Sequence, residues 1–163
     1  MRIPFEKLSD QSHIWIYASQ HPIHPQQQTH ILQLAQTFTD TWTSHGQPLT
    51  GSATLLNNHF LILAAETTGQ PLSCCREDSI ITFMHQIKGT LDIDLMNRTH
   101  VTLAKEDHIW TLPIQAARAQ IKNKTLPANT YIFDNTISYK GDLVDKWKIP
   151  VEVSWLCRGS CLF

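Results

Sequence analysis

GSATLLNNHFLILAA, residues 51 to 65, is the stretch that decides the fold. It contains two strand-like runs, Gly51 to Leu56 and His59 to Ala65, on either side of Asn57-Asn58. Asparagine tolerates the positive φ angles that a tight turn requires, so the stretch predicts an antiparallel hairpin. The apolar run over residues 60 to 65 is far shorter than the roughly 20 residues that cross a bilayer.

A strand and a helix are predicted before this hairpin. Residues 13 to 18, HIWIYA, carry β-branched and aromatic side chains on both faces, which favours a strand at the centre of a sheet. Pro22 and Pro25 then interrupt the chain. An apolar helical stripe follows at three- and four-residue steps, formed by Ile31, Leu34, Ala35, Phe38 and Trp42. We expect Gly46 to end this helix, with His45 in its last turn.

A second helix and a further strand are predicted after the hairpin. The helix is marked by Ile80, Ile81, Met84 and Ile87 and ends at Gly89. Residues 91 to 95, LDIDL, alternate apolar and acidic side chains, which is typical of a strand with one wet face. The resulting βαββαβ order predicts a ferredoxin-like plait over roughly residues 12–96, with both helices on one face of an antiparallel sheet.

The remaining chain predicts a C-terminal α/β extension of shorter elements. These are a hairpin over 101–103 and 108–112, a helix from Pro113 to Lys122, a strand over 130–133, a helical turn over 142–147 and a closing strand over 151–155. Because no repeat or linker interrupts the sequence, we predict one α+β domain over residues 1–163.

Composition excludes several classes of protein. Hydrophobic residues make up 42% and charged residues 17%, as in a folded globular chain. A formal net charge of −1 creates no general attraction for nucleic acid, so that partner is unsupported. The N-terminus lacks the apolar core of a signal peptide, which favours a soluble cytoplasmic protein with no membrane partner. A protein partner or self-association stays open, and the cysteines are expected to be reduced thiols.

Common enzyme signatures are missing. The glycines form neither phosphate-binding array, Gly-x-x-x-x-Gly-Lys-Ser/Thr or Gly-x-Gly-x-x-Gly. The histidines form no His-Glu-x-x-His, and no serine lies in Gly-x-Ser-x-Gly. The sequence therefore leans away from an enzyme.

The segment Ser73 to Ser79 is the most suggestive of chemistry. It is expected at the start of the second helix, where the helix dipole and Arg76 would stabilise a thiolate on Cys74 or Cys75. His45 or His85 would be the base. The alternative is structural: the cysteines are small buried hydrophobes, while Asp78 and Ser79 cap the helix.

Possible metal sites are weaker. A four-thiolate zinc site would need Cys74 and Cys75 to meet Cys157 and Cys161, but neither pair has Cys-x-x-Cys spacing, and the alternative for the later pair is a frayed tail. His21, His24 and His30 are separated by prolines and are expected to face solvent. We therefore predict no metal and no cofactor.

Two charged patterns have a plain interpretation beside a functional one. Asp92 and Asp94 would share one strand face and could bind a hard cation, or they could simply be solvated. A basic patch with two following aromatic residues suggests nucleotide stacking, but three charges are too few to carry that function. The patch consists of Arg118, Lys122 and Lys124, followed by Tyr131 and Phe133.

Short motifs are distributed over most of the chain: Trp15-Ile16-Tyr17, Trp42 to Gly46, Cys74 with Ser79, Arg98, and Trp147 through Pro150 to Ser154-Trp155. Together they resemble a small bacterial family of uncharacterised proteins often labelled ABC transporter ATPases. The chain departs from the Gly-Cys-Ser-Ile-Asp pattern of that family. It has Ser73, Cys75, Arg76 and Glu77 where Gly, Ser, Ile and Asp would stand.

The ATPase label conflicts with the residues, because the chain has neither a phosphate-binding loop nor a Leu-Ser-Gly-Gly-Gln signature. We therefore expect no ATP hydrolysis. The resemblance implies instead that five residues belong to one site or one structural cluster. They are Trp42, His45, Cys74, Ser79 and Arg98.

Three hypotheses about function follow, given in descending order of preference. The first is a non-enzymatic binding or interaction domain. The second is a small thiol-dependent enzyme with Cys74 or Cys75 as nucleophile, His45 as base and Arg98 holding an anion. The third is a sensor of a small anion at the start of the second helix, beside Arg76.

Overall fold

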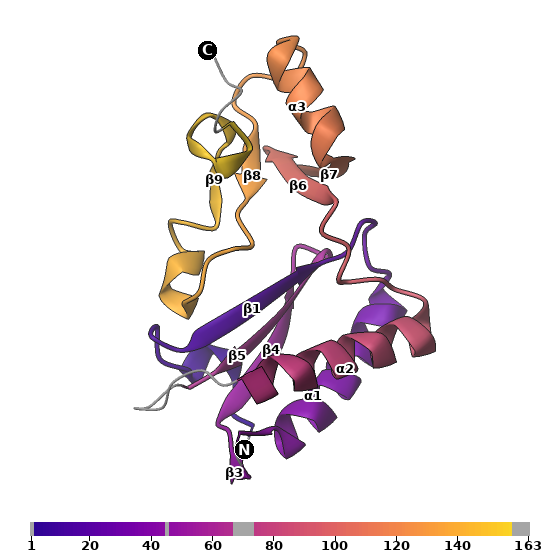
Figure 1. Cartoon of the computed structure of the whole chain (residues 1–163), viewed down its shortest axis with the longest axis vertical. Coiled ribbons are helices and arrows are strands. Elements are labelled where there is room, and N and C mark those ends of the chain that lie inside the picture. Colours follow the sequence, from indigo (N-terminus) through magenta and orange to yellow (C-terminus); the bar gives the residue numbers. More distant parts are fainter. Residues whose placement is uncertain (1, 45, 67–73, 158–163) are drawn as a thin grey trace.

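The computed structural model describes residues 2–44, 46–66 and 74–157, and the side chains of residues 74–77 lie outside that description. Within these ranges the chain is mixed α+β, with three α-helices and three antiparallel sheets. Figure 1 shows α1 and α2 against the sheet that contains β1, while β6 to β9 and α3 lie beyond β1.

The first sheet contains the predicted hairpin. Its strands are β1 (His13–Ala18), β4 (Gly51–Leu56) and β5 (Phe60–Ala65), in the antiparallel order β1-β5-β4. Asn57 and Asn58 have φ angles of 54° and 59°, so the hairpin and its turn are confirmed.

The central position predicted for residues 13–18 is wrong. β1 lies at the edge of its sheet, and β5 occupies the centre. All six residues of β5 are buried, whereas only Ile14 is buried in β1. The aliphatic run of β5 suits burial on both faces, while the larger rings of β1 stay partly accessible at the edge.

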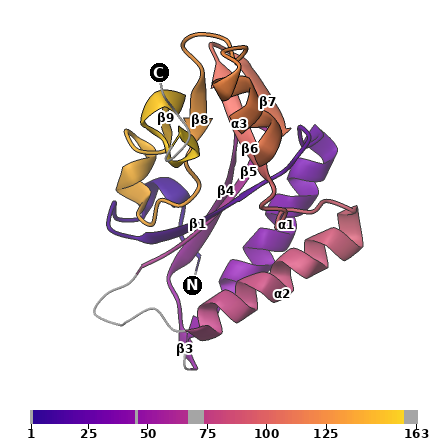
Figure 2. The same cartoon turned by 45° about the horizontal axis from the view of Figure 1, so that its top comes forward.

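Two helices cover one face of this sheet (Figure 2). They are α1 (Pro25–Thr41) and α2 (Cys74–Leu91). The side chains of Leu61, Leu63 and Ala65 on β5 belong to the core beneath them. The helical residues of this core are Ile31, Ala35, Ile80, Phe83, Met84 and Ile87.

The end predicted for the first helix is wrong. α1 ends at Thr41, and Trp42 has an extended backbone that leads into β2 (Thr43–Ser44). Gly46, with a φ of 76°, lies between β2 and β3 (Gln47–Pro48) and not at the end of a helix. His45 lies outside the described residues.

The strand predicted over residues 91–95 is absent, so the ferredoxin-like plait is not confirmed. α2 continues through Gly89 to Leu91, and Asp92 follows it with a φ of 56°. Asp94 accepts a hydrogen bond from the backbone N–H of Met96, and one of its oxygens lies 3.7 Å from Lys88 Nζ. A local turn thus replaces a strand ladder, and Asp92 and Asp94 share no strand face.

The second sheet contains β6 (His100–Lys105), β7 (His108–Pro113), β8 (Tyr131–Phe133) and β9 (Lys148–Pro150), in the order β7-β6-β8-β9. The hairpin of β6 and β7, the helix α3 (Ile114–Lys122) and the strand β8 agree with prediction. The helical turn overlaps the predicted range: a 3₁₀ helix covers Lys140–Leu143, and the N–H of Lys146 donates to the carbonyl of Asp142. The closing strand, predicted over 151–155, is β9 at Lys148–Pro150. Residues 151–153 and 155–157 form 3₁₀ turns instead.

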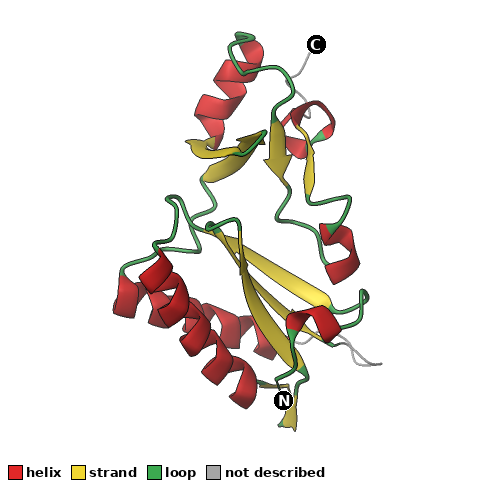
Figure 3. Cartoon of the chain, turned by 180° about the vertical axis from the view of Figure 1, so that it is seen from behind, coloured by secondary structure: helices red, strands yellow, loops and turns green. Residues whose placement is uncertain are grey.

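The two sheets share a core through the other face of β5. Phe60, Ile62 and Ala64 pack with Phe133 and Trp147 from the second half of the chain. The ring centroid of Phe60 lies 4.7 Å from that of Phe133 and 4.9 Å from that of Trp147. Figure 3 shows the second sheet on the side of the first sheet away from α1 and α2.

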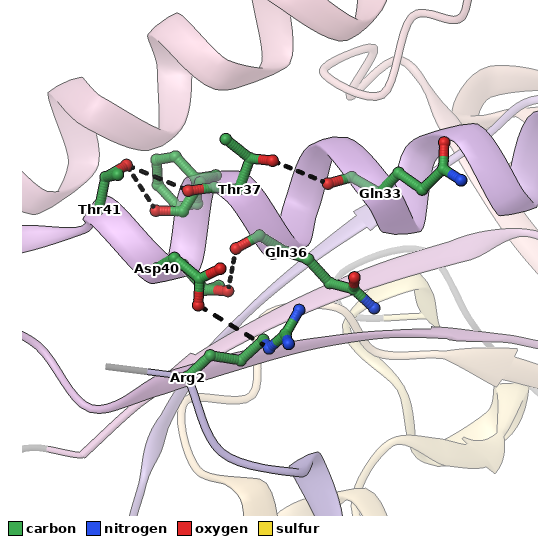
Figure 4. A network of polar contacts seen from close by, with 8 residues as sticks. Arg2, Gln33, Gln36, Thr37, Asp40 and Thr41 are labelled. Atoms are coloured by element: carbon green, nitrogen blue, oxygen red, sulfur yellow. Dashed lines mark hydrogen bonds and ion pairs between the residues drawn. The ribbon is translucent and has the colours of Figure 1, made fainter.

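The N-terminal segment covers the outer edge of β4. The backbone N–H of Ile3 donates to the carbonyl of Gly51 over 3.1 Å, and Arg2 Nε lies 3.8 Å from Asp40 Oδ1 on α1. Figure 4 shows this ion pair beside the hydroxyls of Thr37 and Thr41, which donate to carbonyls one turn earlier. Because Arg2 and Asp40 are about half exposed, their ion pair adds little stability.

Replacing Ile62 with alanine tests the shared core. The side chain is fully buried, so Ile62→Ala is expected to reduce the free energy of unfolding by about 2–5 kcal/mol. Chemical denaturation should show one cooperative transition by tryptophan fluorescence and by circular dichroism. The control is Ile81→Ala, on the exposed side of α2, with an expected change within about 0.5 kcal/mol. Two separate transitions in the Ile62 variant would contradict a shared core.

His59 connects the β4–β5 turn to the end of β1 by hydrogen bonds. It is buried, and its Nδ1–H donates to the carbonyl of Ser19 over 3.3 Å, while the N–H of Ser19 donates to the carbonyl of His59. Burial lowers the pKa of His59 below its ordinary value of 6.5. The bond to Ser19 raises this pKa, and the neighbouring His21 lowers it further.

Acidification should therefore destabilise the fold through His59. The neutral ring is favoured in the folded state, so its contribution is complete above about pH 6.5 and is lost as the pH falls through the lowered pKa. His59→Asn should reduce the slope of the free energy of unfolding against pH by up to about 1.4 kcal/mol per pH unit, which corresponds to one proton. Urea unfolding between pH 5 and 8 measures this slope. Equal slopes in the natural protein and in His59→Asn would refute the assignment.

Candidate functional site

A cavity of about 380 Å³ lies where the end of β1 meets the second half of the chain. We call it the junction cavity. Its polar lining residues are Tyr17, Asn97, Arg98, His100, Thr102, Asn135 and Thr136. Apolar walls come from both halves of the chain and include Ile16, Leu95, Phe133 and Trp155. The volume lies within the range of pockets that hold small molecules.

Arg98 is the only arginine or lysine that lines the junction cavity. Its side chain is exposed. The ion pairs between described residues join Arg2 to Asp40, Lys88 to Asp94 and Lys146 to Asp142, and none of them includes Arg98. No lining residue is a carboxylate. The guanidinium is therefore free to bind an anionic group.

His100 holds the segment of Arg98 against the end of β1. Its Nε2 lies 3.2 Å from the amide nitrogen of Gln20, and its Nδ1 lies 2.9 Å from the hydroxyl of Thr99. The amide nitrogen is a donor, so Nε2 accepts and Nδ1–H donates to Thr99. The backbone N–H and hydroxyl of Thr99 in turn donate to Asn97 Oδ1. This network fixes residues 97–100 on both sides of Arg98.

The opposite wall is fixed by residues 134–136. Trp147 Nε1 donates to Asn135 Oδ1 over 2.9 Å, and the N–H of Asp134 donates to the carbonyl of Trp147. Asp134 Oδ1 accepts hydrogen bonds from the backbone N–H and the hydroxyl of Thr136. Because Trp147 belongs to the shared core, the wall is anchored to the core that joins the two sheets.

Trp42 and Ser79 line a different cavity, of about 310 Å³, between the end of α1 and α2. Trp42 is 2% exposed and packs against Phe38 and Trp15, with ring centroids 5.0 Å and 5.5 Å away. Its indole Nε1 has no hydrogen-bond partner among the described residues. Ser79 is half-buried in the second turn of α2, so neither it nor Asp78 caps that helix. The packing of Trp42 is that of a core residue.

The cysteine segment lies at the start of α2. Cys74, Cys75 and Arg76 are in the first turn, where only their backbone is described. His85, the other proposed base, is exposed on α2. Arg98 follows the C-terminal end of this 18-residue helix, and a helix of that length spans about 27 Å. The fold thus separates Arg98 from the start of α2.

The other predicted features are dispersed. The described residues contain no group of three or more histidine, cysteine or acidic side chains placed to hold a metal. His21, His24 and His30 are exposed, and His24 precedes α1 as its N-cap. Cys157 is buried in the core beneath α3, which corrects the frayed-tail interpretation at that position, whereas Cys161 lies outside the described residues.

The structure separates the two aromatic residues of the basic patch, whose three charges are too few to carry a nucleotide-binding function. Arg118, Lys122 and Lys124 are exposed, but Phe133 is buried in the shared core. Tyr131 lies beneath the ammonium group of Lys148, which is 5.7 Å from the ring centroid. One aromatic ring of the patch is therefore buried, and the other is exposed with a cation over its ring.

Sequence reasoning missed most of the junction cavity. Of its lining, only Arg98 was a predicted binding residue, while Asn97, His100, Asn135 and Thr136 were not. These side chains come from segments with no common motif. The one local signal is Asn97-Arg98-Thr99, in which an asparagine two residues before a threonine favours the observed side-chain-to-backbone turn.

Comparison with protein-family models, with curated proteins and with solved structures gives no match. The resemblance to the bacterial family therefore stays a prediction. In the described part of the chain, no helix has the length and apolar character needed to cross a membrane.

Proposed function

We propose that this protein is a non-enzymatic binding domain whose ligand is a small organic anion held in the junction cavity. The observation that carries the proposal is the placement of Arg98. Its guanidinium has no carboxylate partner among the described residues and lies at a cavity of ligand size. A carboxylate or phosphate group bound there would form charge-assisted hydrogen bonds.

The remaining lining indicates what the anion carries with it. Leu95, Phe133 and Trp155 offer apolar contact, while Asn97, Asn135 and Thr136 offer neutral donors and acceptors. A bare inorganic anion would leave the apolar walls unused. A ligand with one anionic end and a partly apolar body fits all three kinds of surface.

The chemistry of the lining favours binding over catalysis. No cysteine lines the junction cavity, and both ring nitrogens of His100 are engaged in the hydrogen bonds that order residues 97–100. A nucleophile paired with a base is the minimum for covalent catalysis, and the lining does not offer that pair. The thiol enzyme stays a separate hypothesis about the start of α2.

Replacing Arg98 with glutamine tests the proposal. A thermal-shift screen of carboxylates and phosphate monoesters is expected to yield ligands that raise the melting temperature of the natural protein. Calorimetric titration should then show an affinity loss on the order of 10- to 100-fold in Arg98→Gln, because a charge-assisted bond is lost. Arg118→Gln, which removes an exposed charge from α3, is the matched control and should bind normally. Equal affinity in Arg98→Gln and Arg118→Gln would sink the proposal.

A further inference from the structure

Part of the outer edge of β1 has no backbone hydrogen bond to another described residue. The N–H of Ile14 donates to the carbonyl of Ser138 over 2.9 Å, on the side away from β5, while the N–H of Ser19 donates toward β5 at His59. In an antiparallel ladder both polar groups of one residue point to the same side, and the side alternates along the strand. The N–H and C=O of Ile16 and Ala18 therefore point away from β5.

This edge opens into the junction cavity. Residues 138 and 139 pair with the start of β1, through the antiparallel bridge between His13 and Tyr139. Among the described residues, no backbone hydrogen bond continues that pairing toward Ala18. Ile16 and Ala18 line the cavity, and Asn135 and Thr136 form its opposite wall. The two segments thus diverge, and the cavity fills the wedge between them.

We propose that the ligand is a short apolar peptide with a free C-terminal carboxylate, which adds to the edge of β1 as a guest strand. This inference rests on the proposed function and specifies its ligand class. The backbone of the peptide pairs with the polar groups of Ile16 and Ala18, and its carboxylate binds Arg98. Strand addition of this kind obtains affinity from main-chain hydrogen bonds and selectivity from flanking side-chain pockets.

The positions of the cavity's ends set the direction and length of the peptide. The contact between Gln20 and His100 places the segment of Arg98 at the C-terminal end of β1. A peptide whose carboxylate lies there runs parallel to β1. Ser138 closes the edge at Ile14, and the His100 segment closes the other end. The open edge accommodates about three residues at roughly 3.3 Å each.

The two faces of the guest strand determine its side chains. Ile16 and Phe133 belong to the core shared by the two sheets, whereas Leu95 belongs to the core beneath α1 and α2. These cores lie on opposite faces of the first sheet. Successive side chains of a strand point to opposite faces, so neighbouring residues of the peptide meet apolar walls in turn. An apolar tripeptide satisfies both walls.

The test uses tripeptides built from valine, leucine and phenylalanine as the probe. Affinity selection with mass spectrometry identifies the tightest member of this mixture, and calorimetry then measures its affinity. Four comparison ligands are titrated beside it: its C-terminal amide, its analogue N-methylated at the central residue, an amide-free carboxylate such as 3-phenylpropionate, and a decapeptide ending in the same three residues. Each is titrated against the natural protein, Arg98→Gln and the control Arg118→Gln.

We expect the free tripeptide to bind at least tenfold more tightly than each comparison ligand. Arg98→Gln should abolish its preference over the C-terminal amide, and Arg118→Gln should retain it. If 3-phenylpropionate binds as tightly and depends on Arg98, the peptide inference fails while the proposed function stands. If the decapeptide binds as tightly, the short ligand is overturned in favour of the end of a larger chain. Absence of binding by every carboxylate overturns both proposals.

Discussion

Burial of both faces of β5 is the constraint on which the rest of the structure depends. Leu61, Leu63 and Ala65 must meet helices on one side, while Phe60 and Ile62 must meet aromatic rings on the other. A strand buried on both faces belongs at the centre of its sheet, so β1 and β4 become the edges. The positions of the helices, the second sheet and the open edge all follow from this.

The two edges are managed differently. The edge of β4 is bonded by the N-terminal segment at Gly51 and lies against α1. Among the described residues, the edge of β1 is hydrogen-bonded only near its start, by residues 138–140. Unpaired edges invite pairing with other chains, and proteins usually cover them. Here the described part of the second half of the chain lies over the rest of the edge without pairing with it. The edge that could pair with another chain is therefore confined to a cavity of limited size.

Local signals in the sequence predicted the elements better than their arrangement. The hairpin was predictable because Asn57 and Asn58 supply the turn and the flanking runs supply the strands. The position of β1 was not, because its rings suit a half-covered edge as well as a covered centre. Alternation over residues 91–95 also misled, since a turn with Leu95 buried and Asp94 hydrogen-bonded satisfies the same pattern. The site depends on long-range convergence, so only Arg98 was anticipated.

The location of the cavity links binding to the integrity of the fold. One wall is β1, and the other contains Asn135, which accepts a hydrogen bond from Trp147. Both walls adjoin the core that the two sheets share. A ligand that contacts both walls therefore binds only when the two sheets are packed against each other. It stabilises the folded state by mass action. Because the hydrogen bonds of Thr99 and Trp147 order the walls beforehand, little ordering remains to oppose association. A small ligand can then bind usefully through one charge and a few main-chain bonds.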